Sequence, residues 1–291
     1  MSIKINNVSF IYNQGSSFES HALKDVSLEI NENEFIGLIG HTGSGKSTLV
    51  QLLNALLLPT EGTVEVDGMP THIKNEDLKK IRQKVGLVFQ YPEYQLFEET
   101  IAKDIAFGPK NLGLSDEEVE ARVKYAMELV GLNYEELKDQ SPFDLSGGQK
   151  RRVAIASVIA MKPKYLILDE PTAGLDPQGR DDILDEIKEM YHKDPKLTII
   201  IVSHSMEDIA RLAKRVIVMH QGMVFADDSP RNIYSKDEAL EGIGLAVPEI
   251  TKVTKLLKEK GYKFDQTILT VEEAYEALKG QVRKGGYKDA N

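Results

Sequence analysis

Short apolar runs, separated by polar or glycine-containing turns, recur along the first 230 positions and predict a buried sheet. Four of these runs are apolar almost throughout, as in strands covered on both faces, and they span residues 35–39, 85–89, 165–168 and 197–202. Residues 26–30 instead alternate with period two, which predicts a strand with one buried face. The groups 3–5 and 8–12 are interpreted as edge strands. Hairpin signals stand at Asp67-Gly68, after a strand at 63–66, and at Gly222, between strands at 216–219 and 223–226.

Helical spacing of apolar residues replaces the strand pattern between these runs. Residues 115–131 predict a helix in which Ser115 and Glu118 form a capping box and Gly131 follows the last turn. A second helix is expected from Ser146 to about residue 161, because serine is a favoured N-cap. Together with the aromatic loop at 91–97, these helices predict a helical subdomain at about 91–162, inserted between two strands of the sheet.

The chain changes character beyond about residue 240. Gly242, Gly244 and Pro248 predict a linker, followed by helices at 248–260 and at about 270–279. From Gly285 onward we expect a frayed end. Two short helices make a poor domain alone, so the extension 241–291 is expected to dock on its own core or across a dimer interface. We therefore divide the chain into a domain at 1–240 and this extension.

Composition limits the possible functions. A chain of 291 residues can hold one large α/β domain plus an appendage. It has no cysteine, which excludes disulfides and thiolate metal sites. The formal net charge of −10 argues against sequence-independent binding of duplex nucleic acid, which relies on clustered Lys and Arg. No leader pattern follows Met1 and no run approaches 18 apolar residues, so we expect a soluble, cytoplasmic protein.

A glycine-rich loop joins the apolar run 35–39 to an expected helix carrying Leu49, Leu52, Leu53, Leu56 and Leu57. The loop reads Gly40, His41, Thr42, Gly43, Ser44, Gly45, Lys46 and Ser47. Its glycines let backbone N–H groups converge on phosphate oxygens, its lysine offers an ammonium group, and its last serine can ligate Mg²⁺. The alternative is a glycine turn that binds no ligand. Such a turn would not need to lie between a buried strand and a helix, whereas a phosphate-binding loop does. The sequence therefore predicts a triphosphate site.

Polar residues follow three of the apolar runs, where open α/β sheets bind ligands. Asp169 and Glu170 end the run at 165–168, Gln90 follows the run at 85–89, and His204 follows the run at 197–202. Because successive strand residues point in opposite directions, we expect Asp169 to hold Mg²⁺ directly or through water and Glu170 to meet the attacking water. The alternatives are solvated carboxylates at a strand end and a structural histidine.

Three further features remain open on pattern alone. Tyr12, at a strand end, is either a base-stacking ring or an ordinary strand tyrosine. Ser146, Gly147, Gly148 and Gln149 open a helix that can bind an anion, or form only a flexible cap. The cluster Tyr91, Tyr94, Leu96 and Phe97 is either a local core or an exposed patch for a partner.

Taken together, these motifs resemble the ATP-binding-cassette (ABC) ATPase family over most of the first 235 positions. Residues 40–47 match its Walker A loop, Gln90 its Q-loop, 145–149 its signature, 166–169 its Walker B strand and 173–176 its D-loop. Glu170 matches its catalytic carboxylate and His204 its switch histidine. The resemblance implies a P-loop NTPase (RecA-like) core with an antiparallel β subdomain, an inserted α-helical subdomain and a small C-terminal helical extension.

The same resemblance implies how the residues act. Tyr12, the loop 40–47 and Thr48 would bind ATP; Ser47, Gln90 and, through water, Asp169 would hold Mg²⁺. Glu170, His204 and Gln90 would carry catalysis. Two cassettes pair head to tail in this family, so the signature residues 146–149 would contact the partner's ATP. Asp176 belongs to the D-loop. The chain therefore needs a second ABC ATPase subunit, with a heterodimer favoured and a homodimer possible.

Within this family, residues 89–97, the loop start at 40–43 and the tail resemble energy-coupling factor (ECF) transporter ATPases of the second type. The resemblance implies a peripheral subunit on the cytoplasmic face of the cell membrane that powers uptake of a vitamin or a transition-metal ion. Its membrane scaffold would contact Tyr91 to Phe107, and a separate membrane subunit would bind the substrate. The alternatives are another ABC importer and a separate-chain exporter; nucleic acid is not expected as a partner.

Overall fold

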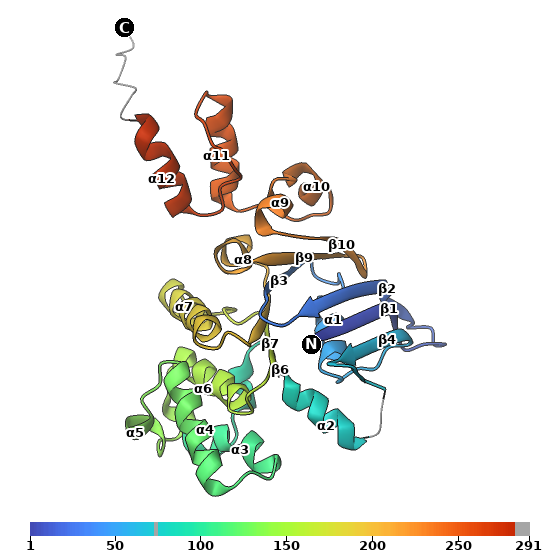
Figure 1. Cartoon of the computed structure of the whole chain (residues 1–291), viewed down its shortest axis with the longest axis vertical. Helices are drawn as coiled ribbons and strands as arrows, with labels where there is room; N and C mark the ends of the chain where they lie inside the picture. Colours follow the sequence, from blue (N-terminus) through green and yellow to red (C-terminus); the bar gives the residue numbers. More distant parts are fainter. Residues whose placement is uncertain (73–74, 283–291) are drawn as a thin grey trace.

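A six-stranded, mostly parallel sheet forms the centre of the protein (Figure 1). The computed structural model describes residues 1–72 and 75–282. In spatial order the strands are β10 (Met223–Asp228), β9 (Arg215–His220), β3 (Phe35–Ile39), β8 (Thr198–Val202), β7 (Tyr165–Asp169) and β6 (Val85–Val88). Only β10 runs antiparallel to its neighbour. The apolar runs identified in the sequence are these strands, and the expected α/β class is confirmed.

An antiparallel sheet packs beside the central one, to its right in Figure 1. Its order is β2 (Ser20–Asn31), β1 (Ser2–Tyr12), β4 (Glu61–Val66) and β5 (Met69–Pro70). The prediction of two edge strands in β1 is wrong, because β1 is one continuous strand between β2 and β4. The two groups are separated by an irregularity at Asn7, whose φ is +49°. Such a bulge shifts the alternation without ending the strand.

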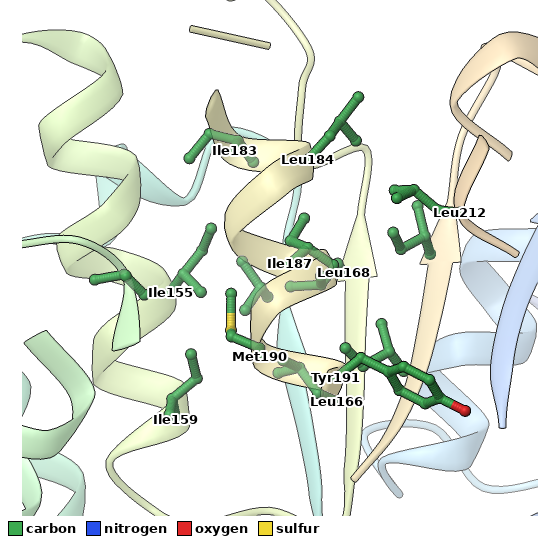
Figure 2. Packing of buried hydrophobic residues seen from close by; sticks show 14 of the residues in the cluster. Ile155, Ile159, Leu166, Leu168, Ile183, Leu184, Ile187, Met190, Tyr191 and Leu212 are labelled. Carbon is green, nitrogen blue, oxygen red and sulfur yellow. The ribbon is translucent and has the colours of Figure 1, made fainter. Parts of the chain in front are cut away.

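The central strands bury their two faces in different cores. Ile36, Leu38 and Ile200 face the antiparallel sheet and α1 (Lys46–Leu53), whereas Phe35 and Ile199 face the opposite helical layer. That layer contains α6 (Gly147–Ile159), α7 (Pro177–Lys193) and α8 (Met206–Leu212). Figure 2 shows side chains of α7 between those of α6 and β7. Each fully buried aliphatic side chain contributes roughly 1.5–3 kcal/mol to this packing.

One of the expected helices is shorter than predicted. The helix after the phosphate loop ends at Leu53, so Leu56 and Leu57 lie beyond it, and Leu56 is exposed. By contrast, the helix at 115–131 is confirmed as α4 (Asp116–Leu129), with Ser115 as its N-cap and Gly131 at φ +69°.

Several short helical elements complete the region between β4 and α6. They are α2 (Asn75–Lys84), the 3₁₀ helix η1 (Pro92–Gln95), α3 (Ile101–Asn111), α5 (Tyr134–Leu137) and the 3₁₀ helix η2 (Pro142–Asp144). In Figure 1, α3 to α6 gather at the lower left, away from the antiparallel sheet. The residues that follow β6 therefore lead directly into this helical group.

The C-terminal segment contacts the rest of its own chain. It contains α9 (Pro230–Tyr234), α10 (Asp237–Gly242), α11 (Glu249–Glu259) and α12 (Val271–Val282), which lie at the top of Figure 1. The backbone N–H of Glu249 donates to Glu207 of α8 at 3.3 Å, and Leu269 belongs to the core cluster of the helical layer. Within the segment, Arg231 donates to Glu273 at 2.6 Å, and Lys255 donates to Asp237 at 2.6 Å. Gly285 and the expected frayed end lie outside the described residues. Within the described part of the chain, no helix is long and apolar enough to cross a membrane.

Candidate nucleotide site at the carboxyl edge of the central sheet

A cavity of about 520 Å³ opens where β3, β6, β7 and β8 end. It gathers residues from six separate segments of the chain. The expected residues that line it are Tyr12, Thr42, Gly43, Gly45, Lys46, Ser47, Thr48, Gln90, Asp169, Glu170 and His204. The parallel strands bring these segments together because their carboxyl ends share one edge of the sheet.

The loop before α1 supplies the floor of the cavity. Gly45 has φ +102°, and a Cβ added there would lie 2.7 Å from the carbonyl oxygen of Ala22, so only glycine fits without displacement. At Gly43, with φ +81°, an added Cβ would meet nothing within 4 Å. The loop is therefore tightly packed against the protein at Gly45 and open on the cavity side at Gly43. This arrangement suits the backbone cradle of a phosphate group.

Lys46 is buried in the cavity with only 6% of its surface exposed. Its ammonium donates to the carbonyl oxygens of Gly40 at 2.6 Å and His41 at 3.1 Å. Burial lowers the pKa of Lys46, and the carboxylates of Glu170 and Asp169 oppose that shift. A phosphate group placed in the cavity would add further negative charge and favour the ammonium form.

Glu170 lies just beyond the end of β7, in the left-handed backbone region at φ +51°. Strand alternation therefore does not set the direction of its side chain, and both carboxylates line the same cavity. Burial raises the pKa of Glu170 to about 7, and its side chain is 13% exposed. Among the described residues its Oε1 has no hydrogen-bond partner. Glu170 is thus a half-buried carboxyl group whose Oε1 is shielded from solvent, poised to accept a proton or a hydrogen bond from a bound molecule.

His204 lies beside this carboxyl group, with Nε2 at 3.2 Å from Oε1 of Glu170. The contact is close, but it lacks the geometry of a hydrogen bond. Burial and the charge of Lys46 lower the pKa of His204, so its imidazole is neutral at pH 7. Burial likewise raises the pKa of Asp169, and Lys46 opposes this.

Tyr12 lies at the rim of the cavity, where β1 ends. Its hydroxyl is 3.2 Å from Oγ1 of Thr48, and its ring packs edge-on against Phe10 at a centroid distance of 4.8 Å. Because 38% of its surface is exposed, Tyr12 is not a core residue. Part of the residue is therefore accessible to a planar group that could stack on its ring.

Three residues of the phosphate loop do not line the cavity. Ser44 is buried, and its Oγ has no hydrogen-bond partner among the described residues. His41 lies 3.2 Å, Nε2 to Nδ1, from His220. The remaining one, Gly40, supplies the carbonyl oxygen that accepts from Lys46. These residues shape the loop through contacts with the protein.

The expected signature residues also lie away from the cavity of their own chain. Ser146 caps α6, as predicted, and also forms a reciprocal capping box with Gln149. Added Cβ atoms at Gly147 and Gly148 would meet nothing within 4 Å, so this helix start faces open space. Asp176 is exposed and caps α7. In one chain the phosphate loop and both carboxylates therefore line the cavity, whereas the exposed start of α6 lies outside it.

Four cavity residues were not identified from the sequence: Ser20, His21, Ala22 and Val202. The first three begin β2 and reach the cavity because β2 pairs with β1, where Ser20 lies opposite Tyr12. The pairing of these strands was not part of the prediction. Val202 was identified only as a residue of a buried strand.

The donor set suits a magnesium ion held jointly with phosphate oxygens. Ser47, Gln90 and Asp169 bring oxygen atoms to one cavity. Across residues 1–72 and 75–282, no group of three or more His, Cys, Asp or Glu could hold a metal without other ligands. Magnesium commonly keeps only one or two protein ligands beside substrate phosphates, so the residues present fit it.

Comparison with known proteins bears directly on this site. The family model described as ABC transporter matches residues 23–173. The energy-coupling factor transporter ATP-binding protein EcfA2 of Clostridium tetani (strain Massachusetts / E88) is 58% identical over 278 residues, which cover 96% of each chain. The protein of the same name from Clostridium perfringens (strain 13 / Type A) is 59% identical, over 96% of this chain and 97% of that one.

Solved structures share the fold. The structure of cbiO1 from Clostridium perfringens, described as part of the ABC transporter complex cbiONQ, has a TM-score of 0.74 and 36% identity. It covers 88% of this chain and 98% of that chain. A dimeric ATP-binding cassette in a post-hydrolysis state, bound to ADP and phosphate, has a TM-score of 0.69 and 32% identity. It covers 79% of this chain and 99% of that chain.

Proposed function

Because this chain belongs to the ABC transporter family, and to its energy-coupling factor branch, we propose that the cavity beside Lys46 binds and hydrolyses ATP to drive import. The chain is an ATP-hydrolysing subunit of an importer of this type. The observation that carries the site assignment is the convergence of a phosphate loop, two carboxylates, Gln90 and His204 on one cavity.

Each side chain has a proposed task in hydrolysis. Lys46 places its ammonium against the β- and γ-phosphates, and the open N–H groups of the loop bind their oxygens. Glu170 accepts a hydrogen bond from the attacking water and orients it toward the γ-phosphorus. His204 and Gln90 contact the γ-phosphate. Magnesium, held by Ser47, Gln90 and, through water, Asp169, would offset the negative charge of the phosphates.

Stacking of the adenine ring is assigned to Tyr12. Its exposed rim position and the hydrogen-bonding distance to Thr48 support this assignment. The Thr48 contact fixes the direction of the tyrosine ring, which leaves less side-chain freedom to lose on binding.

A second ATPase subunit would complete the site. The helix start at residues 146–149 and the exposed Asp176 do not line the cavity of their own chain. We propose that they contact the ATP bound by the facing subunit, and that this subunit is a related but distinct chain, although a second copy would satisfy the same geometry. The exposed N–H groups of α6 offer the anion site that such a contact needs.

The membrane contact is assigned to the segment from Tyr91 to Phe107. Tyr94 is 85% exposed and Phe97 57% exposed, and Phe97 packs edge-on against Phe107 at 5.0 Å. Clustered exposed aromatic rings are typical of a protein interface. Leu96, by contrast, is buried and belongs to the core. We propose that a membrane scaffold subunit covers these rings on the cytoplasmic side, and that another membrane subunit binds the cargo, a vitamin or a transition-metal ion.

Replacement of Glu170 tests the proposed reaction. Glu170→Gln should bind Mg-ATP and pair with its partner subunit, but should lose at least a hundredfold in kcat, because an amide cannot accept the proton of water. Glu189→Gln makes the same exchange on the exposed face of α7 and serves as the matched control. Turnover of Glu170→Gln within tenfold of the wild type would remove Glu170 from this role.

Replacement of Phe97 tests the membrane contact. Phe97→Asp should prevent co-purification with the membrane subunits from native membranes while leaving ATP affinity unchanged, because a carboxylate in the interface would be desolvated. Phe18→Asp places the same charge at an exposed phenylalanine on the loop between β1 and β2. Normal co-purification of Phe97→Asp would contradict the assignment.

A further inference from the structure

Arg151 is the largest side chain that the fold buries completely, with 1% of it exposed. It lies in α6, five residues after Ser146. A guanidinium group cannot be neutralised by losing its proton, so burial is tolerated only when its N–H groups find acceptors. The hydrogen-bond acceptors of Arg151 therefore identify the segments of the chain that hold it in place.

These partners come from two different segments. Nη2 and Nε donate to the two carboxylate oxygens of Glu93, at 2.9 and 3.2 Å. Nη1 donates to the carbonyl oxygens of Pro171 and Ala173, at 3.0 and 2.7 Å. Glu93 belongs to η1, in the exposed aromatic segment, whereas Pro171 and Ala173 follow Glu170 directly. One rigid, planar group thus holds both segments.

Tyr91 makes a second contact between the same two segments. Its ring centroid lies 6.0 Å from the guanidinium carbon of Arg151. The ring also packs on Gly174, where an added Cβ would lie 3.3 Å from its Cε1. Gly174 stands two residues before Asp176. The aromatic segment therefore contacts the loop directly at Gly174, two residues before Asp176, and through Arg151 at Pro171, next to Glu170.

We propose that Arg151 is a positioning residue that ties the exposed aromatic segment to the loop carrying Glu170 and Asp176. A partner that binds the aromatic rings would then shift Glu93 and Tyr91, and through Arg151 the position of Glu170. The membrane subunit would in this way control the rate of hydrolysis without touching the nucleotide. Control of hydrolysis by the membrane subunit rests on the proposed function. The contacts of Arg151 with Glu93 and with the loop after Glu170 do not depend on which partner binds.

Kinetic constants can distinguish a role of Arg151 in positioning Glu170 from a role in stabilising the fold alone. Arg151 does not line the cavity, so its replacement should leave ATP affinity within about twofold. A displacement of about 1 Å at a reacting group can lower a rate by about a hundredfold. Arg151→Lys keeps the charge but cannot form the fork to Glu93 and the carbonyl oxygens together. We expect its kcat to fall at least tenfold at saturating ATP, with unchanged KM.

Arg152 offers a matched control on the same helix. It pairs with Glu186 at 2.7 Å and Asp182 at 3.5 Å and touches neither segment through an ion pair. Arg152→Lys should retain kcat within twofold. Glu93→Gln should lower kcat by less than Arg151→Lys does. The double variant Glu93→Gln/Arg151→Lys should be no slower than Arg151→Lys alone, because both changes break the same contact. Far-ultraviolet circular dichroism and the ATP affinity report whether each variant is folded.

The decisive measurement compares the ATPase pair alone with the full membrane assembly purified from native membranes. The wild type should change its kcat on assembly, and Arg151→Lys should assemble but show less than a third of that change. A normal kcat in Arg151→Lys, or an equal loss in Arg152→Lys, would overturn the inference. If Glu170→Gln retained turnover, the proposed reaction would fail independently of these results.

Discussion

Replacing Glu170 should stabilise the nucleotide-free protein in a pH-dependent way. The structure holds this carboxyl group in a buried position, without a hydrogen-bond partner at Oε1 among the described residues, and raises its pKa from an ordinary value of 4.5 to about 7. A raised pKa means that the ionised form is disfavoured by folding. Above pH 7 the native protein must therefore carry a carboxylate whose burial opposes folding. Glu170→Gln removes that charge and keeps the shape of the side chain.

The magnitude follows from the two pKa values. Between 4.5 and about 7 the unfolded chain binds fewer protons than the native protein, so the penalty grows with pH across this interval. At 1.36 kcal/mol per pKa unit it reaches about 3 kcal/mol at pH 8, against about 1.4 kcal/mol at pH 5.5. Below both pKa values the penalty vanishes, since both states are protonated. The side chain is only 13% exposed, so solvent screening is limited.

Urea-induced unfolding at pH 5.5 and pH 8 measures the effect. Glu170→Gln should gain about 2 kcal/mol more stability over the wild type at pH 8 than at pH 5.5. Glu189→Gln, the exposed control, should change stability by less than about 0.5 kcal/mol at both values. An equal difference between wild type and Glu170→Gln at the two pH values would refute the argument that the folded protein disfavours the carboxylate.

Three further predictions concern the same site. Because only ionised Glu170 can accept the proton of the attacking water, kcat/KM for ATP should fall about tenfold per pH unit below pH 7, and a flat profile from pH 5.5 to 8 would contradict this. Lys46→Ala should weaken ATP binding by about a hundredfold, equivalent to about 2.7 kcal/mol, in a titration with a fluorescent nucleotide; retained micromolar affinity would argue against the phosphate loop. Gly45→Ala should lower the free energy of unfolding by about 1–3 kcal/mol, because its Cβ would lie 2.7 Å from a carbonyl oxygen at φ +102°. Gly15→Ala, at φ +78° but with nothing within 4 Å, should cost less in the same unfolding assay, and equal losses would show that the clash at Gly45 is unimportant.

Much of the fold followed from patterns confined to single segments. Apolar runs predicted the central strands, and side-chain caps such as Ser146 and Ser115 predicted helix starts, because both signals depend on neighbouring residues only. The strand β1 was misjudged because an irregularity at Asn7 looks like a turn in the sequence. No prediction was made for α2, whose sequence between Asn75 and Lys84 has few apolar residues.

The candidate site was predictable wherever a local sequence motif determines the backbone conformation. The phosphate loop and the polar residues after the strands were found because parallel strands share one carboxyl edge. His21 and its neighbours were missed because their approach depends on how β2 pairs with β1. The left-handed conformation of Glu170 was also missed, since nothing in the local sequence requires it. The ion pair of Arg151 with Glu93 joins residues 58 positions apart, and no local pattern could reveal it.

The order of strands in the central sheet sets when the cavity can form during synthesis. β3, which carries the phosphate loop, lies between β8 and β9, and both are translated long after it. The turn after β9 also braces the loop, because the amide of Gly222 donates to the carbonyl oxygen of Ser44 at 3.0 Å. A nascent chain that has left the ribosome only as far as α7 has neither support. We therefore expect ribosome-bound fragments that lack β8 and β9 to bind ATP more weakly than the complete chain.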